Sequence, residues 1–304
     1  MQTVLPPVLR LIVILFAAFL ARRNLKANRG DLRGALRLAV VFLALGTAID
    51  LLDASSSVSA VAAIWANNLS LRLFSAALIW LGYLAVEPYV RRLWPHALIA
   101  WTRVLEGRLR DPLVGRDLLV GGVAGILSTA VFLLPWTAPW LGLPPPAPIA
   151  QGVGALGSTA QWLAVLLSMA LESFLVPVVY LVCLLLFRVV LRKPWLATAT
   201  FFLVVAVLQF VFYQGIPLAG LWIAATLCLG AIGLIVITRF GLFAFLVTVF
   251  FSSWERLVLT TDPGSWYFGP SALTMALFAA IAVHGFWLSI GGQLTFRDPV
   301  LDEA

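Results

Sequence analysis

Long apolar runs alternate with short polar segments along most of this chain. Most of the runs approach the roughly 20 residues that an α-helix needs to cross a bilayer. Because the runs are continuous rather than alternating, they favour helices over the strands of a barrel. The pattern predicts nine spans, over residues 4–21, 35–52, 69–90, 118–136, 159–192, 194–212, 217–237, 241–254 and 271–291.

Two of these runs are irregular. Residues 159–192 are too long for one straight span, and Pro177 interrupts them. This run is either one tilted, kinked helix or a short re-entrant piece followed by a span. Residues 241–254 are short for a span. In residues 118–136, Gly121 and Gly125 form a G-x-x-x-G motif, which permits close contact between helices.

Composition supports a membrane protein. The 304 residues are 62% hydrophobic and only 11% charged, which is too little charge to cover a soluble domain of this size. We therefore expect an all-α polytopic membrane protein with one membrane domain over residues 1–304. Cys183 and Cys228 both lie within apolar runs, so they are expected to be packing residues rather than a disulfide or a metal pair.

The basic residues are distributed unevenly about the predicted spans. With the N-terminus outside, three of the 20 lysine and arginine residues, Arg10, Arg72 and Arg256, fall on the outer side, and the other 17 fall on the inner side. Basic residues mark the cytosolic side of a membrane protein. The expected topology therefore has an outer N-terminus and a cytosolic C-terminus, and the net charge of +7 reflects sidedness rather than a nucleic-acid partner.

Residues 87–121 form the longest segment that is not simply apolar. At helical spacing, one face carries Trp94, Leu98, Trp101, Leu105 and Leu109, and the opposite face carries His96, Arg103 and Arg110. This pattern predicts a helix lying in the cytosolic interface, within residues 91–116. It anchors the bundle and attracts anionic lipid, or it also docks a cytosolic domain. The candidate contact residues are Arg91, Arg92, Trp94, Trp101, Arg103, Arg108 and Arg110.

Four polar residues inside predicted spans are the other candidates: Asp50, Glu172, Gln209 and His284. A polar or charged side chain is costly in lipid, so each has either a structural partner or a function. Glu172 beside Pro177 would suit a transport site between discontinuous helices. Glu255 and Arg256 are neighbours and could form a local ion pair.

No catalytic motif occurs in this sequence in a context that supports catalysis. A G-x-G-x-x-G sequence covers residues 152–157, but it follows a proline-rich loop rather than a strand, and neither H-R-D nor D-F-G occurs. The chain also lacks H-E-x-x-H and G-x-S-x-G. We therefore expect this chain to be no enzyme and to hold no cofactor or metal.

Three stretches of the chain carry a family resemblance. They are Ala21-Arg22-Arg23-Asn24-Leu25 with Arg29-Gly30-Asp31 and Gly34-Ala35; Glu87-Pro88-Tyr89-Val90-Arg91-Arg92 to Asp111-Pro112-Leu113-Val114-Gly115-Arg116-Asp117; and Thr260-Thr261-Asp262 with Ser265-Trp266-Tyr267, continuing to Gly291-Gly292. Together they resemble, in the same order and over essentially the whole chain, the C-terminal multi-span membrane region of a group of bacterial serine/threonine protein kinases.

The resemblance implies a bacterial cell membrane and an anchoring or sensing role beside a cytosolic kinase domain. This sequence contains no kinase domain, so it carries over no catalytic residue. The chain is expected to be either a fragment of a longer kinase or a separate membrane subunit. A kinase placed directly before residue 4 would lie outside the cell, so a full-length relative would need a further span upstream.

Two functional hypotheses follow, and a weaker third. The first is a non-catalytic sensor or anchor module whose basic interfacial segment contacts the bilayer, anionic lipids and a cytosolic kinase or other signalling domain. The second is a transporter or permease with a site near Glu172 and Pro177. The third is an intramembrane enzyme assembled from distant residues such as Glu172 and His284.

Overall fold

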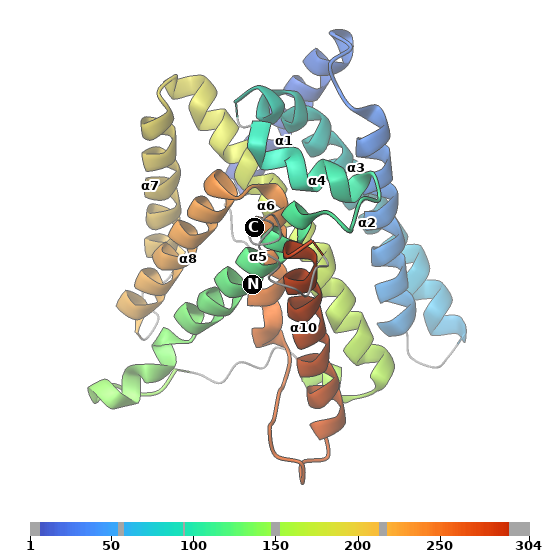
Figure 1. Cartoon of the computed structure of the whole chain (residues 1–304), viewed down its shortest axis with the longest axis vertical. Helices are drawn as coiled ribbons and strands as arrows, with labels where there is room; N and C mark the ends of the chain where they lie inside the picture. Colours follow the sequence, from blue (N-terminus) through green and yellow to red (C-terminus); the bar gives the residue numbers. More distant parts are fainter. Residues whose placement is uncertain (1–6, 54–57, 94, 147–152, 213–217, 292–304) are drawn as a thin grey trace, which may run out of the picture.

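The computed structural model describes residues 7–53, 58–93, 95–146, 153–212 and 218–291, and these residues form helices and connecting segments without strands (Figure 1). The predicted all-α fold is confirmed. The α-helices are α1 (Pro7–Lys26), α2 (Leu32–Asp53), α3 (Val58–Leu93), α4 (Ile99–Leu105), α5 (Pro112–Phe132), α6 (Thr159–Leu191), α7 (Pro194–Phe212), α8 (Ala219–Arg239), α9 (Leu242–Ser252) and α10 (Phe268–Ser289). Short 3₁₀ turns are η1 (Pro95–Leu98), η2 (Leu134–Leu141), η3 (Val153–Leu156) and η4 (Ser253–Arg256).

The number of membrane spans differs from the sequence prediction. Within the described residues, six helices rather than nine are long and apolar enough to cross a membrane: Leu32–Asp53, Asn68–Leu93, Pro112–Leu141, Thr159–Leu191, Ala219–Arg239 and Phe268–Ser289. In α7, the apolar segment found among the described residues is Trp195–Leu208. Helix α9 has 11 residues and is about 16 Å long at 1.5 Å per residue, roughly half the hydrocarbon thickness. Helix α1 contains Arg10 and ends in basic residues.

The long run around Pro177 is one continuous helix. Helix α6 extends over 33 residues, and Pro177 is buried within it. Its N-terminus is capped by Ser158, whose hydroxyl accepts a hydrogen bond of 3.1 Å from the Gln161 N–H. The structure therefore has the single helix of our first interpretation, not the re-entrant piece of the second.

Glycines allow α5 to approach two helices that are distant in sequence. A Cβ on Gly121 would lie 2.6 Å from the Ala244 carbonyl oxygen of α9, and one on Gly125 would meet Phe251 of the same helix. On another part of α5, a Cβ on Gly115 would lie 2.7 Å from the Gly285 carbonyl oxygen of α10. Any side chain would force these helices apart. The close helix contact predicted from the G-x-x-x-G motif is confirmed.

An asparagine joins the end of α1 to an interior turn of α3. Pro88 has no backbone N–H, so the Leu84 carbonyl one turn earlier lacks its usual helical donor. The buried Asn24 side chain donates hydrogen bonds to the Leu84 carbonyl at 2.9 Å and the Ala85 carbonyl at 3.2 Å. Asn24 thus replaces a bond that the proline removes, and fixes α1 against α3.

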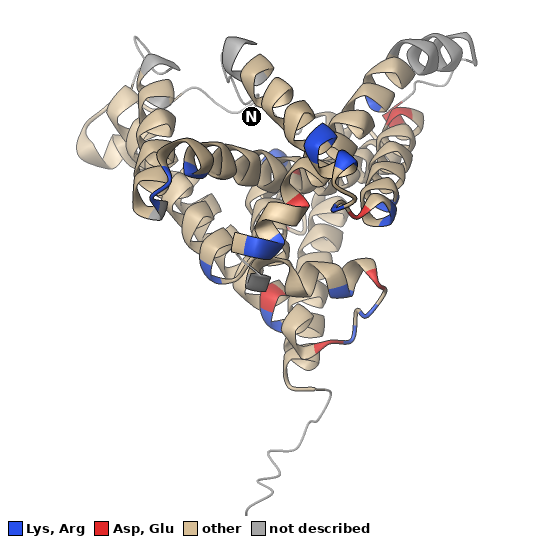
Figure 2. Ribbon diagram, turned by 90° about the horizontal axis from the view of Figure 1, so that it is seen from above, with Lys and Arg blue, Asp and Glu red and all other residues tan. Residues whose placement is uncertain are grey.

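Basic side chains gather at one end of the bundle, which we call the arginine-rich end. It comprises the C-terminal ends of α1, α3, α6 and α8, the start of α2 and the segment from α4 to the first turn of α5. Figure 2 looks onto this end, and its basic residues lie mostly at helix ends and in connecting segments. The exceptions in the described segments are Arg10, near the start of α1, Arg72, within α3, and Arg256, in η4 after α9.

Candidate functional site

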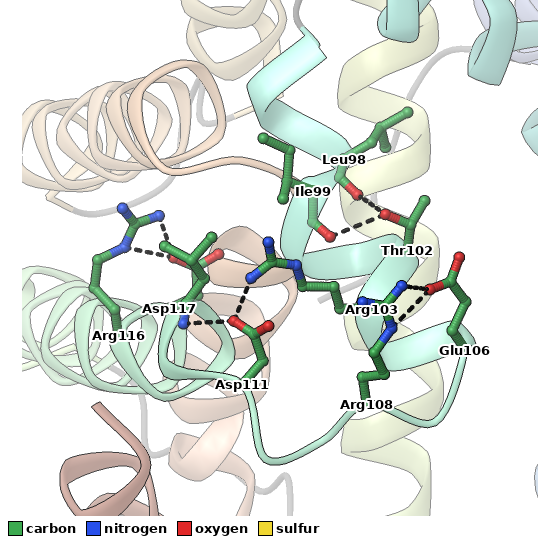
Figure 3. Close-up of polar contacts among 10 residues, drawn as sticks. Leu98, Ile99, Thr102, Arg103, Glu106, Arg108, Asp111, Arg116 and Asp117 are labelled. Atoms are coloured by element: carbon green, nitrogen blue, oxygen red, sulfur yellow. Dashed lines mark hydrogen bonds and ion pairs between the residues drawn. The ribbon is translucent and has the colours of Figure 1, made fainter. Parts of the chain in front are cut away.

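The segment between α3 and α5, residues 95–111, holds most of the contact residues predicted from the sequence, and we call it the connector. It consists of η1, the seven-residue α4 and a loop from Glu106 to Asp111 (Figure 3). The sequence predicted one longer helix reaching Leu109. Helix α4 instead ends before Gly107, which has a φ of 80° that favours glycine.

The inner face of the connector is buried in the bundle. Trp101 is only 3% exposed, and its ring packs edge to face on Phe174 of α6 with centroids 6.0 Å apart. Ala97 and Leu98 are also buried. A Cβ on Gly241, at the α8–α9 junction, would lie 2.6 Å from the Ala97 carbonyl oxygen. In the predicted interfacial helix this apolar face would contact lipid, but Leu98 and Trp101 contact protein, whereas Leu109 is exposed.

The outer face of the connector carries two ion pairs, and a third follows near the start of α5 (Figure 3). Arg103 pairs with Asp111, and Arg108 Nη2 lies 2.7 Å from Glu106 Oε2. In α5, Arg116 Nη2 lies 2.8 Å from Asp117 Oδ1. Among the described arginines from 103 to 116, only Arg110 makes no ion pair or hydrogen bond. Most of the positive charge of this segment is therefore compensated internally.

Asp111 connects the connector to α5. Its Oδ1 accepts a hydrogen bond of 2.9 Å from the Leu113 N–H, which caps α5 at the N-terminus, and the same carboxylate pairs with Arg103. Desolvation by burial raises the pKa of Asp111, but the Leu113 N–H and the Arg103 guanidinium outweigh it, so the pKa lies below its ordinary value. The carboxylate accordingly stays ionised, and Arg103 holds α4 to the start of α5.

The remaining predicted contact residues lie at or just after the end of α3. The Arg91 Nε pairs with Glu87 one turn earlier in the helix, and Arg92 is exposed. Trp94 lies outside the described residues. The predicted contact residues are therefore not equivalent, since Arg92 and Arg110 are exposed and make no ion pair in the described part of the chain, whereas Arg91, Arg103 and Arg108 are paired.

A cluster of buried polar atoms lies beside the connector, and our sequence analysis missed it. In the described structure, Tyr83 Oη, Glu87 Oε2 and Trp101 Nε1 are buried and make no hydrogen bond. A cavity of about 10 Å³ adjoins Tyr83 and Glu87 and is also lined by Val178 and Leu242. This volume admits at most one water molecule and no organic substrate. The available clue was Glu87, an acid in an apolar run four residues before Arg91.

Two of the intramembrane acids form ion pairs with arginines of other segments. Asp50 of α2 binds Arg72 of α3 through both oxygens, with Nη2–Oδ1 at 2.8 Å and Nε–Oδ2 at 3.0 Å, and it also accepts a bond of 3.1 Å from Asn68. Glu172 of α6 accepts a bond of 2.6 Å from Arg256 Nη1. Arg256 therefore pairs with a residue of α6; the side chain of Glu255, the neighbour that the sequence offered as a partner, lies outside the described residues.

The other two intramembrane candidates are His284 and Gln209. His284 is exposed on α10 and stacks on Trp287, with ring centroids 6.2 Å apart. The side chain of Gln209 lies outside the described residues. No hydrogen bond joins Glu172 and His284, both of which are described, so the contacts show no catalytic pair. Among all the residues that the structure describes, no group of three histidine, cysteine, aspartate or glutamate residues could hold a metal ion.

Comparison of the chain with models of protein families, with curated proteins and with solved structures gives no match. The geometry is therefore the basis for assigning a function. Its main features are a connector wedged among membrane helices, internal ion pairs on the connector's outer face, and intramembrane acids paired with arginines.

Proposed function

We propose that this chain is a non-catalytic membrane sensor or anchor module in which the connector reports the packing of the helices to cytosolic partners. The observation that carries the proposal is the burial of Trp101 against Phe174 of α6, while Glu106 to Arg110 on the same short segment are exposed. A rearrangement of α6 within the bundle would displace the connector, because packed side chains transmit movement between discrete arrangements.

The distribution of charge supports a cytosolic location for the connector. Basic residues are enriched on the cytosolic side of membrane proteins, and they gather here at the arginine-rich end. In this proposal the chain lies in a bacterial cell membrane with its N-terminus outside and its C-terminus in the cytosol, which requires that α1, α7 and α9 cross the bilayer together with the six longer helices. The partners are the bilayer, anionic lipids and a kinase or other signalling domain, in keeping with the resemblance to membrane regions of bacterial kinases.

The transporter alternative has less support. It depended on a broken helix at Pro177 and on an available carboxylate at Glu172. Helix α6 is continuous through Pro177, and Glu172 is paired with Arg256. The cavity described above adjoins Glu87 and is too small for an organic substrate.

A spin label on the connector tests the proposal. The label is placed at Leu109→Cys, which is exposed, in a variant with Cys183→Ala and Cys228→Ala, and the protein is reconstituted in bilayers. Glu172→Gln weakens the ion pair between α6 and η4 without touching the connector. We expect the mobility of the label, measured by electron paramagnetic resonance, to increase in this variant.

Trp140→Ala provides the control, because Trp140 is exposed in η2 and removing it should leave the label unchanged. Equal label mobility in the Glu172→Gln protein and the parent would contradict coupling between the bundle and the connector. An equal increase in the Trp140→Ala control would show general loosening instead.

A further inference from the structure

The turn between α1 and α2 carries more uncompensated positive charge than the connector. We call residues 22–37 the α1–α2 hairpin. Six basic residues and the single acidic residue Asp31 give it a net charge of +5. The basic side chains are exposed, and the first five make no ion pair in the described structure: Arg22, Arg23, Lys26, Arg29 and Arg33. The sixth, Arg37, donates to the Leu105 carbonyl at 3.4 Å.

The acid of the hairpin has a structural role. Asp31 Oδ1 accepts a hydrogen bond of 2.9 Å from the Gly34 N–H at the start of α2. It therefore compensates the N-terminus of that helix, where a carboxylate is most stable. The five unpaired basic residues keep a strong positive field at the arginine-rich end.

The backbone of the hairpin is fixed against α3. Asn24 is buried and donates to the Leu84 and Ala85 carbonyls, and a Cβ on Gly30 would lie 3.1 Å from Leu84 Cδ2. A ligand bound by the basic side chains would therefore not have to order the backbone that carries them, which reduces the entropic cost of binding.

Exposed apolar residues continue from the basic residues along each helix. On α1, Leu15 and Phe19 are exposed and lie on the same face as Arg22 and Lys26 at helical spacing. On α2, Leu36 and Val40 are exposed and follow Arg33 on the same face of the helix. Each helix thus presents positive charge beside an apolar stripe, which suits a ligand with a negative head and an apolar tail.

We infer that the α1–α2 hairpin is a binding site for an anionic phospholipid, whose phosphate contacts its unpaired basic side chains and whose acyl chains lie along the exposed stripes of α1 and α2. The apolar stripes select a lipid rather than free phosphate. The site requires only that the helices lie in a bilayer, so it does not depend on coupling through the connector.

Two variants with the same change in charge test this site. The hairpin variant is R22Q/K26Q/R33Q. The control is R192Q/K193Q/R239Q, which removes three exposed basic residues from the α6–α7 junction and the end of α8, away from the contact residues predicted for the connector. Each full-length protein is reconstituted into vesicles of equal phosphatidylglycerol and phosphatidylcholine and extracted in mild detergent. Native mass spectrometry then gives the ratio of the two bound lipids.

The parent protein should retain phosphatidylglycerol in preference to phosphatidylcholine. In the hairpin variant we expect this ratio to fall by about tenfold or more, since each basic residue near a membrane surface adds to the attraction. The control should change by less than about twofold. Equal losses in both variants would show attraction by net charge alone, and an unchanged ratio in the hairpin variant would refute the site.

A third measurement separates lipid from phosphate. Excess inorganic phosphate, with sodium chloride at matched ionic strength as the reference, is added to the parent protein before spectrometry. Retention of phosphatidylglycerol equal to the reference supports a lipid site, whereas its selective displacement would reassign the site to free phosphate. Thermal unfolding of both variants, followed by tryptophan fluorescence, confirms that each still folds.

Discussion

The connector and the α1–α2 hairpin are both rich in arginine and lie at the same end of the bundle, but they use their charge differently. From Arg103 to Asp117, three of the four arginines pair with nearby acids. In the hairpin, the one acid caps a helix, and none of the six basic residues makes an ion pair in the described structure. The number of arginines in a segment therefore does not measure the charge available to a partner; the position of the acids decides it.

The two regions are also held in place differently. The connector depends on a large apolar side chain, Trp101, buried against α6. The hairpin depends on the hydrogen bonds that Asn24 makes to carbonyls near Pro88. Removing Trp101 should therefore destabilise the connector, and removing Asn24 should destabilise the hairpin. The loss of unfolding free energy should be that of a buried aromatic ring in the first case and of buried hydrogen bonds in the second.

Trp101→Ala should have the largest effect. Removing a buried tryptophan that packs on Phe174 should lower the free energy of unfolding by about 3–5 kcal/mol. Thermal or denaturant unfolding in detergent measures the change. Trp140, which is 87% exposed, is the matched control, and Trp140→Ala should stay within about 0.5 kcal/mol of the parent. Similar losses in the two variants would contradict the wedged connector.

Asn24→Ala should have the next largest effect, on the hairpin. The Leu84 carbonyl then loses its donor near Pro88, and a buried group without a partner costs about 1–3 kcal/mol. The same unfolding measurement detects the loss. Adding Pro88→Ala restores a backbone N–H to this turn of α3, so the double variant should recover part of the stability. A double variant less stable than Asn24→Ala alone would argue against the role of Asn24 as a substitute donor for the Leu84 carbonyl.

Asp111→Ala should cost about 1 kcal/mol, because it removes the N-cap of α5 and the partner of Arg103. The pKa of Asp111 lies below its ordinary value in the folded protein, so its contribution is complete above that ordinary pKa, about 3.9, and is lost as pH falls through the lowered value. The difference in unfolding temperature between parent and variant should accordingly shrink in strongly acidic buffer. A difference that is independent of pH would exclude an ionised cap.

Arg103→Gln and Arg33→Gln should have the smallest effects and should separate the two regions most directly. Arg103 is partly buried and paired, so its loss should lower the free energy of unfolding by about 0.2–1 kcal/mol. Arg33 makes no ion pair, and its replacement should leave stability unchanged within error. Equal destabilisation by both, measured by thermal unfolding at low salt, would show that the hairpin arginines also hold the fold.

The sequence predicted the helical architecture well because apolar runs in lipid must be helical. It predicted the number of spans less well, since the run over residues 241–254 contains a helix of 11 residues followed by a 3₁₀ turn. Helical periodicity also placed Leu98 and Trp101 on one face. It did not show whether lipid or protein covers that face, because both are apolar.

Contacts between residues far apart in the sequence were the other feature that the sequence did not predict. Glu172 and Arg256 are 84 residues apart, and Asn24 is 60 residues from the Leu84 carbonyl that it satisfies. No local pattern predicts such pairs. The glycines of α5 indicated a close contact, but their spacing could not name α9 as its partner. Conversely, the ion pairs within residues 103–117 could have been predicted from the sequence, since each acid lies at most eight residues from its arginine.

The glycine surface of α5 has a consequence for the order in which the protein is made. Its partners α9 and α10 are synthesised much later, as shown by the bond from the Thr129 hydroxyl to the Ser252 carbonyl, 123 residues further along the chain. Protein synthesis adds about 5–20 residues per second, so α5 is in the membrane for several seconds or longer before α9 and α10 are synthesised. During that time the glycines of α5 can contact small residues on other helices. Incorrect helix pairing should therefore occur most readily after α5 is synthesised and before α9 is complete.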